Sequence, residues 1–124
     1  MTHEIPSGIA YLATPYSRYP RGTSEAFKDA SKIAAQLLCA GLKVYSPIAH
    51  THPIAVYGAL DLLDHSIWLP FDEAMMEVAS VLIVAQLEGW EESKGVAHEV
   101  KFFADRGKPI YDLDPRSLMM KRRA

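Results

Sequence analysis

The chain has 124 residues, of which 49% are hydrophobic and 23% charged, and its formal net charge is −2. This composition is typical of one compact globular domain over residues 1–124, large enough to fold without disulfides or a structural metal. A charge so close to zero excludes a global field that would draw the protein onto nucleic acid or an anionic membrane, and we expect neither as a partner.

The expected compartment follows from the absence of targeting segments. The sequence has neither the basic and apolar regions of a signal peptide nor a run of about 18 apolar residues, so a cytoplasmic location is expected. The single cysteine, Cys39, lies in an apolar stretch with helical spacing. We predict a small buried thiol there rather than a nucleophile with a base beside it.

The first part of the chain predicts a βαβ unit. A short apolar run at 9–13 indicates a strand, which stops at a turn because Pro15 cannot extend a central strand. Ser24 is a suitable N-cap for a helix over 25–40. The unit is completed by a C-cap at Gly41 and a second strand at 42–46.

Residues 47–66 are predicted to form mostly a long loop, because they contain two prolines, three histidines and a glycine. Only a short helix around 57–63 is expected within them. Loops of this length in compact domains usually act as lids or binding segments. Substrate contact by His50 and His52 is therefore one interpretation of this loop.

The second half of the chain continues the alternation of strands and helices. Pro70 suits the first turn of a helix that runs to about Ala79, which places Asp72 in that first turn. The apolar run at 78–85 predicts a buried strand. The remaining predicted elements are a helix from about Gly95 to Ala104, a fourth strand at 109–111 and a short helix near 115–121.

This alternation, with no repeat or linker, predicts a three-layer α/β domain of flavodoxin-like or Rossmann-like type. We expect a mostly parallel sheet of four or five strands with the order 2-1-3-4. Open sheets of this kind bind ligands at the carboxyl ends of the strands, where the strand order reverses. The expected site therefore lies between the loop after the first strand and the loop before Glu99.

Glu99 is the leading candidate for chemistry. It follows the turn Ser93-x-Gly95 on the first turns of a helix, where apolar neighbours could desolvate its carboxyl and make it a nucleophile or a base. A glutamate near a helix N-terminus is also favourable for dipole reasons alone. Ser93 and Gly95, with the free amides of the helix, could bind a phosphate or carboxylate or could simply cap the helix.

Two further residues, Asp72 and Tyr11, are expected to converge on the same end of the sheet. Each could orient a substrate hydroxyl or hold Glu99 in its working state. The simpler interpretation makes Asp72 a helix-dipole partner and Tyr11 a core residue. Their importance depends on their meeting Glu99 in space.

A metal site is a third possibility in the 47–66 segment. His50 and His52 form an H-x-H pair that could supply three zinc ligands together with His65 or Asp64. Substrate contact or hydrogen bonding within the loop is the favoured alternative, so no metal is expected. The sequence also has neither a Walker lysine motif nor a G-x-G-x-x-G run, and no cofactor is expected.

Several segments together resemble the nucleoside 2-deoxyribosyltransferase superfamily, over most of the chain. They are Tyr11-Leu12-Ala13, Asp72, and Ser93-x-Gly95-x-x-x-Glu99 followed by Ala104 and Gly107-Lys108-Pro109-Ile110. The chain looks closest to a small bacterial branch that carries two further motifs. These are YLATPYS at 11–17 and SPIAHTHP at 46–53.

The resemblance implies that Glu99 attacks the anomeric carbon of a sugar and forms a glycosyl-enzyme intermediate, which water or a second base then resolves. Asp72 and Tyr11 would position the sugar and the nucleophile. This agrees with the two-step covalent mechanism of retaining glycoside cleavage.

The resemblance also bears on whether the substrate carries a 5′-phosphate. Transferases of free nucleosides tend to have an aspartate where this chain has Ser93, whereas the related nucleotide N-glycosidases have serine there. Ser93 would therefore suit a 5′-phosphate, and Arg18 or Arg21 could add the countercharge. Pro15 and Ser17, in the same turn as Arg18, are further candidates for substrate contact.

The superfamily is usually dimeric or larger, which implies a homodimer or homotetramer here. Tyr57, Trp68 or the C-terminal segment could then serve a neighbouring subunit. The 47–66 segment is not a feature of the characterised enzymes, so the base and the sugar stay open.

Three functions are weighed. The first is an N-glycosidic bond enzyme, a hydrolase or a transferase, that acts on a nucleoside or nucleoside 5′-monophosphate without a cofactor. The second is a binding or sensor domain that holds a nucleotide-like ligand through Ser93, Gly95 and Arg18. The third is a metal-dependent hydrolase built on His50 and His52.

Overall fold

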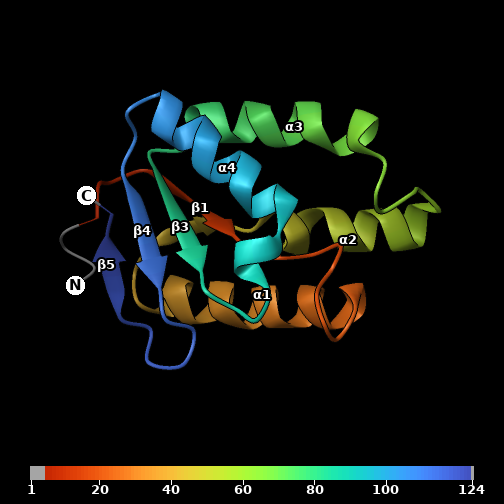
Figure 1. Cartoon of the computed structure of the whole chain (residues 1–124), viewed down its shortest axis with the longest axis horizontal. Coiled ribbons are helices and arrows are strands. Elements are labelled where there is room, and N and C mark those ends of the chain that lie inside the picture. Colours follow the sequence, from red (N-terminus) through yellow and green to blue (C-terminus); the bar gives the residue numbers. More distant parts are fainter. Residues whose placement is uncertain (1–4, 124) are drawn as a thin grey trace.

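The computed structural model describes residues 5–123, which form a single five-stranded sheet with helices on both faces (Figure 1). The strand order is β2-β1-β3-β4-β5, and all neighbours are parallel except β4 and β5. The strands are β1 (Ile9–Ala13), β2 (Lys43–Tyr45), β3 (Val81–Ala85), β4 (Ile110–Leu113) and β5 (Met120–Arg122). The predicted three-layer α/β fold and the order 2-1-3-4 are confirmed.

Burial of the two central strands explains why their sequences are apolar runs that could be recognised as strands. β3 is buried at all five positions and β1 at four of five, because helices cover both faces of the sheet. Tyr11 of β1 lies opposite Leu82 of β3, and on its other side opposite Tyr45 of β2. The side chain of Tyr11 is therefore fixed in the middle of the sheet.

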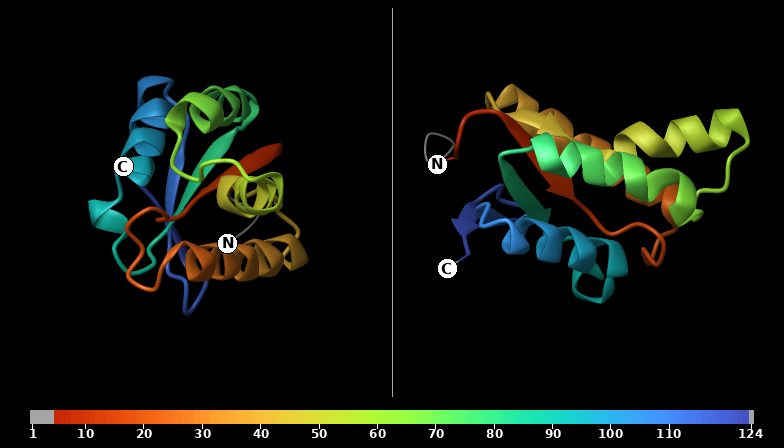
Figure 2. Two further views of the ribbon diagram at one scale, coloured as in Figure 1. Left: turned by 90° about the vertical axis from the view of Figure 1, so that its right-hand side faces the viewer. Right: turned by 90° about the horizontal axis from the view of Figure 1, so that it is seen from above.

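The helices form the outer layers (Figure 2). They are α1 (Thr23–Cys39), α2 (Pro47–Gly58), α3 (His65–Val78) and α4 (Lys94–Asp105). One core lies between the sheet and α1, where Ile33 and Leu37 pack. A second core lies on the opposite face, where Met76 of α3 and Phe103 of α4 pack near Tyr11. α2 packs beside α1 and extends past the sheet.

The prediction of a long loop over 47–66 is wrong, because α2 occupies most of that segment. Ser46 is the N-cap, and its hydroxyl accepts a hydrogen bond from the Ala49 amide at 3.1 Å. Pro47 follows at the first helical position, where its missing N–H costs nothing. The expected helix at 57–63 is also absent, because α2 ends at Gly58 and its C-cap Ala59 has a left-handed φ of 55°.

The start of α3 also differs from its prediction. Asp64 is the N-cap and accepts a hydrogen bond from the Ser66 amide at 3.0 Å, so the helix begins at His65. Pro70 therefore lies inside the helix rather than in its first turn. Asp72 lies further along, beyond the first turn. The helix-dipole interpretation of Asp72 consequently loses its basis.

Three smaller predictions are wrong. Gly22, not Ser24, occupies the N-cap of α1, and no side chain caps that end, although Gly41 does follow the helix with φ 98°. Cys39 is exposed, because it lies on the side of α1 that faces away from the sheet. The expected helix near 115–121 is replaced by a turn in which Leu118 has φ 63°, and β5 follows it.

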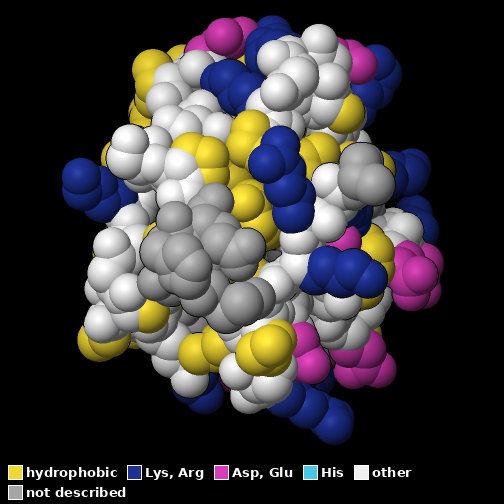
Figure 3. Space-filling view, turned by 90° about the vertical axis from the view of Figure 1, so that its left-hand side faces the viewer, with side chains coloured by type: hydrophobic (Ala, Val, Ile, Leu, Met, Phe, Trp, Pro, Cys, Tyr) yellow, Lys and Arg dark blue, Asp and Glu magenta, His cyan; other side chains and the backbone are white. Residues whose placement is uncertain are grey.

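The side of the molecule that carries the chain ends is shown in Figure 3, where Lys and Arg side chains surround exposed hydrophobic atoms. Residues 1–4, part of the region expected to lack a signal segment, lie outside the described residues. Among residues 5–123, none of the helices has the length and hydrophobicity that a membrane crossing requires.

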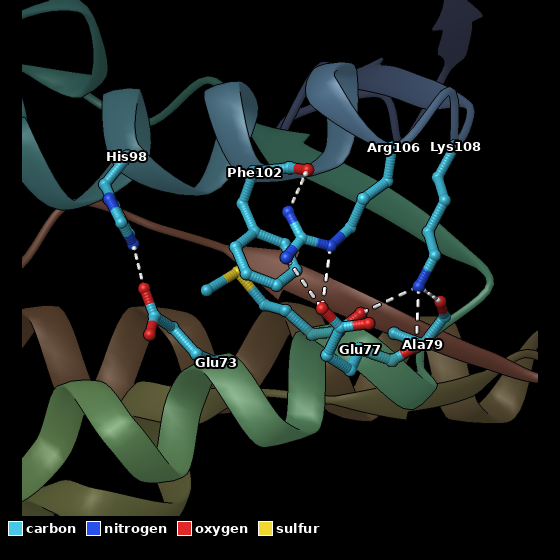
Figure 4. A network of polar contacts seen from close by, with 8 residues as sticks. Glu73, Glu77, Ala79, His98, Phe102, Arg106 and Lys108 are labelled. Atoms are coloured by element: carbon cyan, nitrogen blue, oxygen red, sulfur yellow. Dashed lines mark hydrogen bonds and ion pairs between the residues drawn. The ribbon is translucent and has the colours of Figure 1, made fainter.

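A polar seam joins α3 to α4 (Figure 4). Lys108 Nζ donates to the carbonyl oxygens of Met76, Glu77 and Ala79 at 3.0, 2.7 and 2.8 Å. This ammonium group satisfies carbonyls that the end of α3 would otherwise leave unpaired. Arg106 adds an ion pair with Glu77, at 2.7 Å. The seam fixes the two helices that carry Asp72 and Glu99.

Replacing Lys108 with methionine should lower the free energy of unfolding by about 2 kcal/mol, because three carbonyls lose a charged donor. Chemical denaturation of both proteins measures the change. The matched control is Lys101→Met, which removes only an exposed i,i+4 ion pair with Asp105 and should cost less than about 0.5 kcal/mol. Equal losses in the two variants would contradict a structural role for the Lys108 contacts.

Candidate active site

A cavity of about 350 Å³ opens at the carboxyl end of β1, which is a size that suits a small-molecule ligand. Several elements line it: the β1–α1 loop, the start of α2, the segment before α3, α3 itself and the start of α4. The loop contributes Thr14, Tyr16 and Ser17, and α3 contributes Trp68 and Asp72. The cavity thus lies where the strand order reverses, between β1 and β3.

Glu99 extends from the second turn of α4 into the lining of this cavity. Burial of its carboxyl, followed by the negative charge of Asp72, raises the pKa to about 8, against the Tyr11 hydroxyl, which lowers it. Burial disfavours the charged form, and a like charge nearby acts in the same direction. At neutral pH Glu99 is therefore largely protonated.

Asp72 faces the same space from α3. Burial raises its pKa to about 6, and the nearby His98 opposes that shift. One of its carboxylate oxygens, Oδ1, is buried without a hydrogen-bond partner. Two carboxyl groups whose pKa values are both raised by burial thus lie close together, and their titrations are coupled.

Tyr11 lies beneath the two carboxyl groups and is fully buried. Burial, followed by the charges of Glu99 and Asp72, raises the pKa of its phenol far above the usual range. Tyr11 therefore stays a neutral hydrogen-bond donor. Its hydroxyl is unpaired in the described structure, beside a carboxyl group to which it could donate.

Unpaired buried polar atoms gather at the base of the cavity. In residues 5–123 they are Tyr11 Oη, Thr14 Oγ1, Tyr45 Oη and Asp72 Oδ1. The charge of Asp72 contributes to the raised pKa values of both tyrosines, which places them near its carboxyl. Leaving such groups unpaired is costly, so their concentration at one place indicates a surface that a polar ligand completes.

The start of α4 forms the donor side of the cavity. Ser93 is the N-cap and accepts a hydrogen bond from the Val96 amide at 3.2 Å, which leaves its hydroxyl proton free to donate. Ser93, Lys94 and Gly95 all line the cavity. A helix N-terminus with a lysine beside it favours an anionic group.

Comparison with known proteins adds a family assignment. A family model described as "Domain of unknown function (DUF1937)" matches residues 8–114. The chain belongs to this family. None of the curated proteins matches the chain. The matched region of the DUF1937 domain contains every residue that lines the cavity, whereas β5 lies outside it.

The DUF1937 domain brings together most of the residues predicted for the site. Glu99, Asp72, Ser93, Gly95 and Ser17 line one cavity. Tyr11 lies directly beside the two carboxyl groups, as its electrostatic influence on Glu99 shows. These residues come from β1, the β1–α1 loop, α3 and α4, so only the tertiary fold makes them neighbours.

Three residues from the first loop lie elsewhere. Arg18 is exposed and Pro15 is buried, and neither of them lines the cavity. Arg21 is held away by an ion pair with Asp29 and by a bond to the Tyr19 hydroxyl. Neither arginine that was predicted as a countercharge lines the cavity, whereas Lys94, at the start of α4, does.

The two histidines of α2 do not line the cavity and do not face one another. His50 stacks on Phe71 of α3, with ring centroids 5.1 Å apart. His52 is buried and contacts Tyr16. Residues two apart on a helix point in different directions, so the H-x-H pattern makes no chelating pair. Residues 5–123 contain no group of three His, Cys, Asp or Glu side chains that could hold a metal.

Sequence reasoning missed several lining residues. Thr14 and Tyr16 lie in the same turn as Ser17, so their position after the first strand was the available signal. His98 immediately precedes Glu99 and could have been found by helical spacing. Four further polar or aromatic lining residues were not predicted to contact substrate, although His65 had been weighed as a zinc ligand: Thr51, His65, Trp68 and Lys94. Trp68 had been considered only as a contact to another subunit.

Proposed function

We propose that this DUF1937 domain cleaves the N-glycosidic bond of a nucleoside or nucleoside 5′-monophosphate, through a covalent intermediate on Glu99. One observation carries the proposal: a buried carboxyl group meets a second carboxyl in one cavity, beside the neutral hydroxyl of a buried tyrosine. The resemblance of the same three residues to the nucleoside 2-deoxyribosyltransferase superfamily supports it.

In the proposed reaction, the Glu99 carboxylate attacks the anomeric carbon while the C–N bond breaks. The base leaves with the bonding electron pair and takes up a proton, which Asp72 can supply because its pKa of about 6 keeps a protonated fraction near neutral pH. Water, or a second base, then attacks the same carbon and releases Glu99. The acceptor loses its proton to Asp72, so charge and protons balance over the cycle.

The charged part of the substrate is expected at the start of α4. The Ser93 hydroxyl, the Lys94 ammonium and the amides near Gly95 can receive a 5′-phosphate there. The protein itself does not require glycine at this position, because an added Cβ would meet only Ser93 Oγ, at 3.8 Å. A ligand that approaches the backbone closely here would explain why this position has no side chain.

The test is incubation of the purified protein with a panel of nucleosides and their 5′-monophosphates, followed by chromatography for free base. Denaturation during turnover and mass analysis of the peptide that contains Glu99 should reveal a glycosyl adduct. Release without an adduct on that peptide would contradict the covalent mechanism. Tight binding of a panel member without any product would favour a sensor domain instead.

The pH dependence of base release should report Glu99. Because Glu99 must be deprotonated and Asp72 protonated, kcat/KM should be bell-shaped, highest near pH 7 between the pKa values of about 6 and about 8. Asp72→Asn removes both the acid and the like charge, so the fall at high pH should disappear and the reaction should slow. Asp105→Asn, at the far end of α4, is the matched control and should leave the profile in place. An unmoved profile in Asp72→Asn would contradict the coupling.

We also propose that the domain forms a homodimer through the ends of α2 and α3. Large exposed hydrophobic side chains concentrate there: Ile54, Val56, Tyr57, Leu60, Leu63, Ile67 and Phe71. Exposed hydrophobic side chains gathered along one stretch of the chain favour an interaction surface. Leu63 also lines the cavity, so this surface adjoins the site.

Tyr57→Glu should weaken dimerisation at least tenfold, because Tyr57 is 89% exposed in the single chain and tyrosines often dominate interfaces. Light scattering after size-exclusion chromatography measures the mass over a dilution series. Val78→Glu, at the opposite end of α3, is the control and should leave the mass unchanged. A monomeric wild-type protein would refute the dimer.

A further inference from the structure

His52 does not line the cavity but contacts a residue that does, Tyr16. The Tyr16 hydroxyl oxygen lies 2.6 Å from His52 Nδ1, and Tyr16 is a lining residue. The two side chains come from different elements, the β1–α1 loop and α2. The mechanism proposed above gives neither residue a role.

The ring of His52 is held in place on two sides. It stacks on Phe27 of α1, with centroids 4.6 Å apart and an interplanar angle of 18°. The Tyr16 ring meets it edge-on at 86°. His52 is only 8% exposed, and burial lowers its pKa, so the imidazole is neutral. One ring nitrogen is therefore a donor and the other an acceptor.

The chemistry of the two groups decides which one donates. A phenol is a better donor than a neutral imidazole N–H, and the imidazole lone pair is a better acceptor than a phenol oxygen. The short separation suits an O–H donor. Tyr16 thus donates its proton to Nδ1, and the proton of His52 is on Nε2.

With its proton engaged, Tyr16 can offer only an oxygen lone pair to any further partner. The Thr23 hydroxyl lies near this oxygen and lowers the pKa of the phenol, against the larger effect of burial, which raises it to about 12. Polar groups around the oxygen therefore interact with it as donors. A ligand in the cavity would meet the same acceptor.

We propose that His52 fixes Tyr16 as a hydrogen-bond acceptor in the cavity wall, so that the domain selects substrates that place an O–H or N–H donor against Tyr16. This inference rests on the proposed function for its substrate class. It also orients the ligand, because the donors lie at Ser93–Gly95 and the acceptor lies at the β1–α1 loop. The anionic group and the donor group of the substrate then contact different elements of the cavity wall.

The first experiment needs no ligand. Nitrogen-15 spectra of the histidine rings in the full-length protein, assigned with His52→Leu, should show His52 as the neutral tautomer with Nδ1 unprotonated. Tyr16→Phe should shift the Nδ1 resonance, because it removes the donor and keeps the ring. A protonated Nδ1 in the neutral ring would overturn the proposal.

The second experiment compares matched ligands. Nucleoside 5′-monophosphates are paired so that one donor is lost at a time: 2′-hydroxyl against 2′-fluoro, 3′-hydroxyl against 3′-fluoro, and amino against oxo bases. Wild-type protein should bind the donor member of at least one pair about tenfold more tightly. Tyr16→Phe should abolish that preference, and His52→Leu should reduce it. Tyr19→Phe, which removes a hydroxyl that bonds Asp29 and does not line the cavity, should preserve it.

The outcomes separate this inference from the proposed function. If Tyr16→Phe retains every preference of the wild type, the acceptor role is wrong even where base release proceeds. If the ligands bind with the expected preference but release no base, the acceptor role stands and the glycosidase proposal fails. If no panel member binds, both are overturned.

Discussion

Replacing Glu99 with glutamine should lower kcat/KM for base release at least about 10³-fold, equivalent to roughly 4 kcal/mol of transition-state stabilisation. Glutamine keeps the shape of the side chain and its place in α4, but a neutral amide oxygen does not form the glycosyl ester. The loss should therefore appear in kcat, and substrate should still bind. Single-turnover measurement of free base, with ligand binding measured in parallel, separates the two effects.

Two comparisons make this result specific. Glu92→Gln changes an exposed carboxyl on the short 3-10 helix before α4 and should retain full activity. Glu99→Asp keeps the carboxylate but withdraws it by one methylene, and it should show a partial loss because the reacting atoms no longer meet. Retention of more than a tenth of wild-type kcat/KM by Glu99→Gln would contradict the assignment of Glu99 as the nucleophile.

The parts of the site that could be predicted are those defined by local sequence. The apolar run before the turn indicated β3, and the cap at Ser93 fixed the start of α4, so the position of Glu99 followed. The carboxyl ends of parallel strands meet at one edge, which placed Tyr11 on the same side. Each of these steps depends on residues close together in the chain.

The parts that were wrong or missed depend on competing local signals or on tertiary contacts. Pro53 and the histidines of 47–66 suggested a loop, although Ser46 and Pro47 form a good helix start. The bond between Tyr16 and His52 joins residues 36 positions apart and has no pattern in the sequence. Burial of Glu99 likewise arises from α3 packing against α4, which spacing alone cannot reveal.

The same Glu99→Gln substitution should stabilise the protein as pH rises. The pKa of Glu99 is about 8 in the folded chain, against 4.5 for a glutamate that is fully exposed to water, so the folded protein binds this proton more tightly than the unfolded chain does. Stability from this group is full below pH 4.5 and is lost progressively as pH rises to about 8. Glutamine does not titrate, so the variant escapes the loss.

We therefore expect the stability difference between Glu99→Gln and wild type to increase by about 3 kcal/mol between pH 5 and pH 9, after allowance for partial solvent access. Urea denaturation across this range measures it, with Glu92→Gln as a control whose difference from wild type stays within about 0.5 kcal/mol. Parallel curves for Glu99→Gln and wild type would show that the carboxyl is not desolvated.

Activity and stability should thus move in opposite directions for one substitution. A carboxyl that fills a purely structural role is expected to stabilise the fold when ionised, through an ion pair or a helix terminus. Glu99 has no ion-pair partner among residues 5–123 and lies beside a second carboxyl, Asp72. If glutamine at this position is more stable and inactive, the group is retained for chemistry at the expense of the fold.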